Sequence, residues 1–240
     1  MPGLYVYAIA DARRRPPLTG LFGRPLRTIG AGGVHAIVEE ASRAPKPTLS
    51  RLRAQDRVLR ALSGHVDPML PARFGSFARN AHELRGMLAG RARELARALK
   101  RARGCAQMTV RLFLDDVPGT AMTVPRRGAS RDAERRRADM GSWTSAPGGA
   151  AYLRQLLAED RARRSHPAVR ALQRAARGVA RAERIEWHDG AVAAASVYHL
   201  VPRPRLQAYL RKVAAAATQE EARVIVSGPF LPFAFGERLR

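Results

Sequence analysis

The sequence predicts an α+β protein of two domains, each a ferredoxin-like sandwich in which helices pack on an antiparallel sheet. Its 240 residues suffice for two domains of modest size, and 46 % apolar residues suffice for their cores. Strand and helix patterns alternate in each half, beside hairpin signals. We place the boundary at Gly104, between an N-terminal ferredoxin-like domain of residues 1–104 and a C-terminal α+β domain of residues 105–240 with long helices. We expect a mobile loop at about 115–148 and an aromatic tail at 227–240.

The N-terminal half begins with a strand and a hairpin. The stretch GLYVYAIA, residues 3–10, is rich in β-branched and aromatic residues and predicts a strand. Two short apolar runs within residues 25–40 are joined by GAGG, whose glycines supply the positive φ that a tight reversal needs. The remaining elements are a helix capped by Thr48 or Ser50 and ended by Gly64, an extended segment over residues 66–77, and a helix from Ala81 to about Arg103 whose leucines step by three and four.

The C-terminal half repeats this alternation. A strand is predicted from about Met108 to Leu114, and the Gly-, Pro- and charge-rich stretch after it predicts the mobile loop. The later predicted elements are a helix at 150–164, a second helix capped by Ser165 with Pro167 in its first turn, a strand within 191–201, a helix within 204–217 and a closing strand within 222–228.

The charge of the chain is extreme, with a net charge of +23 and a pI near 11.7. This favours adhesion to polyanions. Only three of the 43 basic residues are lysines, a bias that is also typical of a GC-rich genome. The most basic runs lack the aromatic residues that nucleic-acid binders interleave with their cations. Non-specific adhesion to polyanions is therefore expected, and specific nucleic-acid binding is only the weaker alternative.

Cysteine usage and hydropathy indicate a soluble protein of the reducing cytoplasm. Cys105 is the only cysteine, which excludes an intrachain disulfide. The first apolar run precedes the arginines at 13–15, the reverse of the order in a signal peptide. No apolar stretch approaches the ~18 residues that span a bilayer, so we expect no membrane association.

The stretch SGPFLPFAFG, residues 227–236, is out of character with so basic a chain. It holds three of the seven phenylalanines, and its two prolines keep the backbone extended and cannot donate to a ladder. Each phenylalanine buries on the order of 150–250 Å² when covered, and three exposed together would form a patch typical of a binding site. The tail therefore either packs over its own sheet, which the sequence favours, or docks on a partner.

A search for chemistry finds no catalytic residues, no metal site and no cofactor. The run GAGGVH has His35 where a dinucleotide-binding loop needs its third glycine, and it precedes a strand instead of a helix. His35 and Glu39 are four apart on a predicted strand and share a face, but one pair is too small a set for a metal. Asp115 and Asp116 end a strand, where carboxylates commonly cap turns. The sequence therefore predicts a protein that is not an enzyme.

Several segments together resemble the gas vesicle protein F/L family, and the match runs nearly end to end. They are LYVYAIAD, RVLRAL, MLPARFGSF, GCAQMTVRL, GGAAYL, VYHLVPRPRLQAYL and the terminal VSGPFLPFAF. The Arg-Phe-Gly block and the tail are the most specific of these. The sequence departs from the family pattern at Gln55, Ala72, Gln107, Phe230 and Phe233, and its Arg-rich 124–148 loop is longer than expected. The departures at Gln55 and Gln107 put any conserved polar contact there in doubt.

The resemblance implies a cytoplasmic, non-enzymatic accessory protein of gas vesicles, associated with the vesicles and without a cofactor. It implies binding to the small hydrophobic shell protein and to other accessory proteins, with a role in nucleation or as a minor shell component. The nucleic-acid adaptor is the alternative, and salt dependence separates the two. The residues expected to bind the partner or to mark the structural signature are Arg73, Phe74, Gly75, Gly228, Pro229, Phe230, Pro232, Phe233 and Phe235. We expect Arg73 to anchor the backbone near Gly75 and Phe74 to fill a gap in the core.

Overall fold

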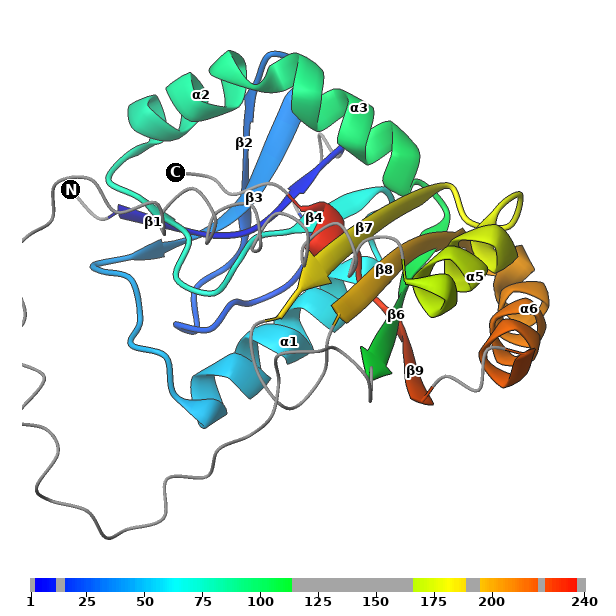
Figure 1. Cartoon of the computed structure of the whole chain (residues 1–240). Helices are drawn as coiled ribbons and strands as arrows, with labels where there is room; N and C mark the ends of the chain where they lie inside the picture. Colours follow the sequence, from blue (N-terminus) through cyan, green and yellow to red (C-terminus); the bar gives the residue numbers. More distant parts are fainter. Residues whose placement is uncertain (1–2, 12–15, 114–165, 189–194, 220–222, 237–240) are drawn as a thin grey trace, which may run out of the picture.

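The computed structural model describes residues 3–11, 16–113, 166–188, 195–219 and 223–236 (Figure 1). Within them the chain forms two antiparallel sheets, each with helices packed on it, so the predicted α+β class is confirmed. The predicted loop at 115–148 and the predicted helix at 150–164 lie outside the described residues.

The N-terminal sheet has the strand order β2-β3-β1-β4, and β5 also pairs with β1. Its strands are β1 (Gly3–Ala10), β2 (Arg27–Ala31), β3 (Val34–Ala41), β4 (Met69–Pro71) and β5 (Phe77–Ala78). The β2–β3 hairpin turns at Gly32 and Gly33, whose φ values are +59° and +82°. Two successive positive φ angles match the twist of the flanking strands, which is why glycines occupy both positions.

Strand β1 carries a bulge that changes which side chains face which layer. Val6 pairs with Val38 and Ala8 with Ile37, so Tyr7 is the additional residue. Before the bulge, Leu4 and Val6 face one core and Tyr5 faces the other. After it, Ala8 follows Tyr7 on the same face.

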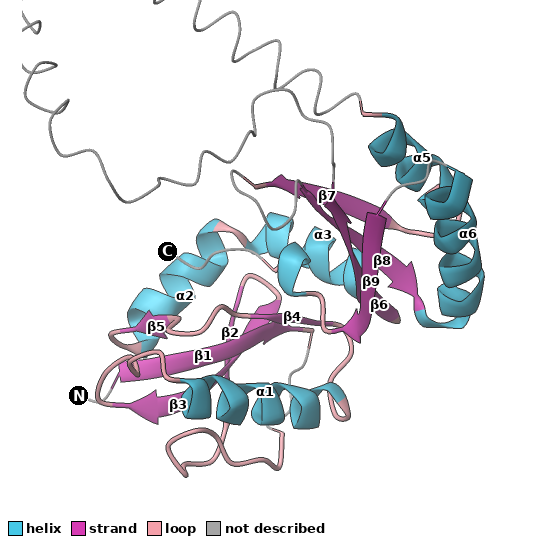
Figure 2. Ribbon diagram, turned by 60° about the horizontal axis from the view of Figure 1, so that its bottom comes forward, coloured by secondary structure: helices cyan, strands magenta, loops and turns pink. Residues whose placement is uncertain are grey.

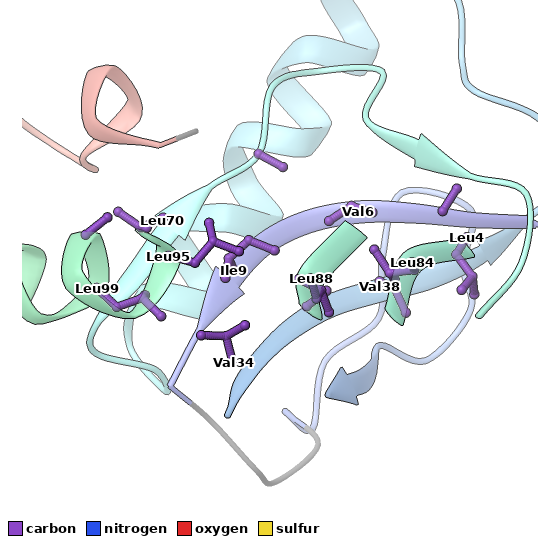
Figure 3. Packing of buried hydrophobic residues seen from close by; sticks show 14 of the residues in the cluster. Leu4, Val6, Ile9, Val34, Val38, Leu70, Leu84, Leu88, Leu95 and Leu99 are labelled. Carbon is purple, nitrogen blue, oxygen red and sulfur yellow. The ribbon is translucent and has the colours of Figure 1, made fainter. Parts of the chain in front are cut away.

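Helices cover both faces of this sheet, in contrast to a two-layer sandwich with its helices on one face (Figure 2). Helix α1 (Leu49–Ser63) packs Leu59 and Leu62 on the tyrosine face. Helices α2 (Ala81–Gly90) and α3 (Ala92–Ala102) pack their leucines on the opposite face, as Figure 3 shows for Leu84, Leu88, Leu95 and Leu99.

The predicted caps of α1 are confirmed, but the single helix predicted from Ala81 to Arg103 is wrong. Thr48 Oγ1 accepts from Arg51 N, and Gly64 follows the last turn. The second prediction resolves into α2 and α3, which break at Arg91, where φ is −121°. Gly90 weakens the helix at this point. The leucine spacing continues across the break and conceals it.

The C-terminal sheet has the order β7-β8-β6-β9, with two helices on one face (Figure 1). Its elements are β6 (Cys105–Phe113), α5 (Pro167–Ala176), β7 (Ala182–Trp187), β8 (Ala195–Pro202), α6 (Leu206–Gln219) and β9 (Arg223–Phe230). Strand β7 was not predicted, and β9 runs two residues beyond the predicted closing strand. The ring of His166 caps α5, because its Nδ1 accepts from Ala168 N at 3.2 Å, and the predicted cap Ser165 lies outside the described residues.

The chain passes from the first sheet to the second at Gly104, where φ is +65°. The Asp67 carboxylate accepts from Gly104 N at 3.0 Å, and Arg203 N donates to Gly104 O at 3.0 Å. The guanidinium of Arg181 donates to the carbonyl of Arg103 at 2.8 Å. The connection is therefore held by hydrogen bonds from both halves, while the division into two domains at Gly104 stays a prediction. No helix in the described parts of the chain is long and apolar enough to cross a membrane.

Candidate interaction surface

The open face of the C-terminal sheet, opposite α5 and α6, carries the aromatic tail. Residues on this face form rows across the strands. One row joins Ile225 to Arg111 and Ser196, a second joins Ser227 to Thr109 and Tyr198, and a third joins Phe230 to Gln107 and Leu200. The tail begins at the end of the third row.

The residues Gly228 and Pro229 form an irregularity in β9. Thr109 pairs with Ser227 and Gln107 pairs with Phe230, so β9 holds one more residue than β6 between these pairs. Gly228 has a φ of +122°, and a Cβ there would lie 2.8 Å from Gln107 O. Glycine is therefore required at this position for both its conformation and its close approach to β6. The bulge directs the chain out of the sheet at Phe230.

A short 3-10 turn, η3 (Phe233–Phe235), is fixed to the open face by two hydrogen bonds. Ala234 N donates to Gln107 Oε1 at 2.7 Å, and the guanidinium of Arg184 donates to Ala234 O at 2.9 Å. The tail thus crosses from the edge strand β9 over β6 to a residue of β7. Gln107 departs from the family pattern, yet it carries a polar contact.

The tail also contacts the N-terminal half, which joins the two most specific sequence blocks. The turn η3 lies against β4, and a Cβ on Gly236 would lie 2.6 Å from Pro71 O. Leu231 packs against the core of Tyr5, Tyr7 and α1, and Pro232 is buried. Figure 1 shows this turn in red beside β4. The tail is therefore a strap between the two sheets.

The phenylalanines of the tail divide between packing and exposure. Phe230 and Phe233 keep 42 % and 41 % of their surface exposed, whereas Phe235 is half-buried. Leu231, Pro232 and the backbone of η3 pack on the protein as predicted for the tail. Two large apolar side chains remain at the surface, held by an ordered strap.

The Arg-Phe-Gly block is anchored differently from the expectation. Gly75 has a φ of +86° and donates its N–H to Tyr5 Oη at 3.2 Å, while Ser76 N donates to Arg73 O at 3.1 Å. The side chain of Arg73 is exposed, so its carbonyl, not its guanidinium, holds the turn. The ring of Phe74 is half-buried and lies edge-on to Tyr5, with centroids 6.2 Å apart.

Tyr5 and Tyr7 belong to a buried polar network that sequence reasoning missed. Glu39 is fully buried, and its carboxylate accepts from Tyr7 Oη at 2.6 Å, from Phe22 N at 2.9 Å and from Arg24 N at 2.8 Å. Burial and the hydrogen bond to Glu39 raise the pKa of Tyr7. Charged hydrogen bonds of this kind are strong. Glu39 thereby holds the loop before β2 on the sheet.

The neighbouring polar residues are also accounted for. Tyr5 Oη donates to Gln55 Oε1, and Gln55 Nε2 donates to Ala72 O at 3.5 Å, so this departure from the family pattern also carries contacts. His35 shares the face of Glu39 but makes no hydrogen bond with it, and its Nδ1 is buried without a partner. The predicted pair is therefore two separate residues. A carboxylate inside the apolar stretch at 34–41 was the available signal for the Glu39 site.

A second buried network lies in the C-terminal half. His199 Nε2 lies 3.0 Å from Glu183 Oε2, and its Nδ1 lies 2.8 Å from Tyr209 Oη. Protonation on Nε2 alone satisfies both bonds, because Nε2 then donates to the carboxylate and Nδ1 accepts from the hydroxyl. The hydrogen bonds from His199 and Gln173 lower the pKa of Glu183. Burial and the charge of Glu183 raise the pKa of Tyr209.

Both networks are saturated by the protein's own groups, which is the arrangement of buried polar residues that position elements of a fold. Within the described ranges no three His, Cys, Asp or Glu side chains form a group suited to a metal ion. The geometry thus defines a mixed α+β protein whose distinctive surface feature is an ordered aromatic strap. Exposed apolar groups of this kind are typical of surfaces that bind other proteins.

The model of the family described as gas vesicle synthesis protein GvpL/GvpF matches residues 3–237. Because this match spans nearly the whole chain, the protein belongs to that family, and the resemblance seen in the sequence is confirmed. Membership supports a role in gas vesicle formation and association with gas vesicle components.

Two crystal structures share the fold. The gas vesicle protein GvpF from Anabaena sp. PCC7120 is 17 % identical, with a TM-score of 0.64 over 99 % of each chain. GvpF from Microcystis aeruginosa is 15 % identical, with a TM-score of 0.67 over 99 % of this chain and 100 % of that one. A search of curated protein sequences finds no match.

Proposed function

We propose that the protein is a non-enzymatic accessory protein of gas vesicle assembly that binds the small hydrophobic shell protein. In this role it assists nucleation or becomes a minor shell component, and it acts in the cytoplasm among other accessory proteins. Family membership supports the process. The observation that carries the binding role is the pair of exposed phenylalanines, Phe230 and Phe233, on a strap that both sheets hold in place.

The physical need for such a partner is simple. A shell subunit that walls off gas presents a wide apolar face, and before assembly this face promotes aggregation. A protein with an ordered apolar surface covers the face temporarily and releases it during assembly. An ordered strap loses less conformational entropy on binding than a disordered segment, which favours affinity.

The two exposed rings set the size of the effect. Covering the 42 % of Phe230 and the 41 % of Phe233 that are exposed removes on the order of 160 Å² of apolar surface from water. At 25 cal/mol per Å² this area corresponds to about 4 kcal/mol, or up to roughly a thousandfold in affinity.

The test is co-purification of the shell protein with variants of the strap. Replacing both Phe230 and Phe233 with serine is expected to lower the melting temperature, because more than half of each ring is buried, to leave the protein folded at the temperature of the assay, and to abolish recovery of the shell protein. The matched control is Leu210→Ser on α6, which removes an apolar side chain of similar exposure, 36 %, away from the strap. Equal recovery of the shell protein by the double variant and the wild type would show that these two rings do not bind it.

A deletion of residues 228–240 reports on the strap as a whole. It removes the contacts to Gln107 and to β4 as well as the rings. Loss of the folded state is expected, because the tail packs on both sheets. A deletion variant that stays folded but no longer recovers the shell protein would show that the tail serves only to bind the partner. The purification is repeated in high salt, because adhesion of a +23 chain to polyanions weakens uniformly as salt rises.

A further inference from the structure

The two edges of the C-terminal sheet differ in chemistry. Edge strand β7 carries the charged residues Glu183, Arg184 and Glu186. Edge strand β9 has Arg223 at its first position and no charge from Val224 to Phe230. Charged side chains on an edge strand discourage pairing with another chain. Strand β7 is therefore protected against pairing with another chain, whereas β9 is not.

The open part of β9 is regular over residues 223–227. These residues pair in continuous register with β6, from Arg223 opposite Phe113 to Ser227 opposite Thr109. In the described part of the chain no strand pairs with the outer edge of β9. Beyond Ser227 the bulge and Pro229, which has no N–H, end the ladder. The available edge is therefore a short strand with a defined end.

The side chains along this edge specify what fits beside them. Val224 and Val226 face the helices and extend the C-terminal core to the edge. On the open face Ile225 is 51 % exposed and pairs across the strands with Arg111, whose exposed guanidinium makes no ion pair within the described residues. Arg223 lies over the ring of Phe113 at 5.0 Å. An added strand thus meets apolar groups on one face and an isoleucine between two cations on the other.

We propose that the outer edge of β9, residues 223–227, receives an extended segment of another polypeptide as an additional strand. The segment is apolar at alternate positions and carries carboxylates that reach Arg111 and Arg223. Backbone hydrogen bonds then supply affinity, and the side chains supply specificity. This binding mode deepens the proposed function. The identity of the natural partner rests on that function.

A second copy of this chain fits the edge poorly. Strand β9 contains no carboxylate, so pairing two β9 edges brings Arg111 and Arg223 of both copies together without compensating charge. Each chain also carries a net charge of +23, which opposes self-association. The chemistry therefore favours an acidic partner over a homodimer.

The test uses fluorescently labelled peptides and the full-length protein. The probe alternates valine and threonine over about seven residues, the length of a typical strand, with a glutamate at each end. Its counterpart has lysine at each end. We expect the glutamate peptide to bind at least about tenfold more tightly than the lysine peptide in low salt. Ile225→Glu is expected to weaken its binding by about tenfold, because a charge on an edge strand opposes pairing and this charge also repels the carboxylates of the peptide.

Two controls distinguish strand addition from non-specific binding of the peptide. Leu210→Glu adds the same charge on α6 and is expected to leave peptide binding unchanged. N-methylation of alternate peptide amides in one phase is expected to abolish binding, whereas the opposite phase, whose amides face solvent, keeps it. Equal binding by both phases, or wild-type binding by Ile225→Glu at an unchanged melting temperature, overturns the proposal. So does a wild-type dimer that an excess of the glutamate peptide converts to a monomer, because a second copy then occupies the edge.

The outcomes also separate this proposal from the proposed function. If Ile225→Glu still recovers the shell protein while the Phe230 and Phe233 variant does not, the accessory role stands and strand addition at β9 is overturned. If the wild type recovers no shell protein but binds the glutamate peptide as expected, the accessory role fails and the strand-accepting edge stands.

Discussion

The contact between Gln107 and the strap predicts how tightly the strap is held. Gln107→Ala removes the oxygen that lies 2.7 Å from Ala234 N and the amide that lies 3.3 Å from Thr109 Oγ1. Ala234 N is partly buried, so the loss of its acceptor costs about 1–2 kcal/mol. At 1.4 kcal/mol per factor of ten, the population with a detached strap rises roughly 5- to 30-fold.

Native-state hydrogen exchange at the Ala234 amide measures this population directly. Exchange at Ala234 is expected to quicken by the same roughly 5- to 30-fold in Gln107→Ala, because detachment exposes the amide. Amides of α2, which packs on the face of the N-terminal sheet opposite the core that Leu231 contacts, are expected to keep their rates. Gln107→Glu retains an acceptor oxygen at the same place and serves as the matched control. An Ala234 amide that exchanges equally fast in wild type and alanine variant refutes the assigned anchor.

Three other substitutions test the networks and the Arg-Phe-Gly turn. Glu39→Gln removes the charge that two backbone amides and Tyr7 share, and should lower the free energy of unfolding in urea by about 2–4 kcal/mol. The pKa of Glu183 is lowered by its hydrogen bond from His199, so its stabilising contribution is complete above pH about 4.3 and is lost as pH falls through the lowered pKa. In Glu183→Gln the melting temperature should therefore fall less steeply than in the wild type as the pH is lowered. Gly75→Ala should cost about 1–2 kcal/mol because its φ is +86°, whereas Gly86→Ala in α2 meets open space and should add about 0.5–1 kcal/mol.

The outcomes that would contradict these expectations are specific. Glu40→Gln, next to Glu39, breaks only partly exposed ion pairs with Arg24 and Arg27 and should cost less than about 1 kcal/mol. A Glu39→Gln loss no larger than this would show that the buried carboxylate is unimportant. An acid limb identical in Glu183→Gln and wild type would remove Glu183 from the titration. Equal effects of alanine at the two glycines would contradict the conformational argument.

Local chemistry made much of the fold predictable. Apolar, β-branched residues gave β1, paired glycines gave the β2–β3 turn, and Thr48 and Gly64 gave the limits of α1. Each of these features depends on residues that are neighbours in sequence. The resemblance to a family then supplied the class of function.

The errors arose where distant residues decide the structure. The stretch AERIEW of β7 mixes charge into both faces, because an edge strand is partly solvated, so its alternation is weak. The division between α2 and α3 is hidden by an unbroken leucine spacing. The contacts that build the candidate surface, from Gln107 and Pro71 to the strap, join residues more than 100 positions apart, and no local pattern reports them.

The bulge in β1 makes the spacing of that strand critical on both of its sides at once. Because Tyr7 is the unpaired residue, odd-numbered residues before it face the same side of the sheet as even-numbered residues after it. Deleting Tyr7 would restore a uniform alternation and leave Val6, Ala8 and Ile9 on their present faces, but it would remove the hydroxyl that donates to Glu39 and accepts from Leu21 N. Deleting any other single residue next to the bulge would turn side chains to the wrong face of the sheet. Relatives that keep the Tyr7–Glu39 contact are therefore expected to differ by substitution within this strand and to place their insertions and deletions elsewhere.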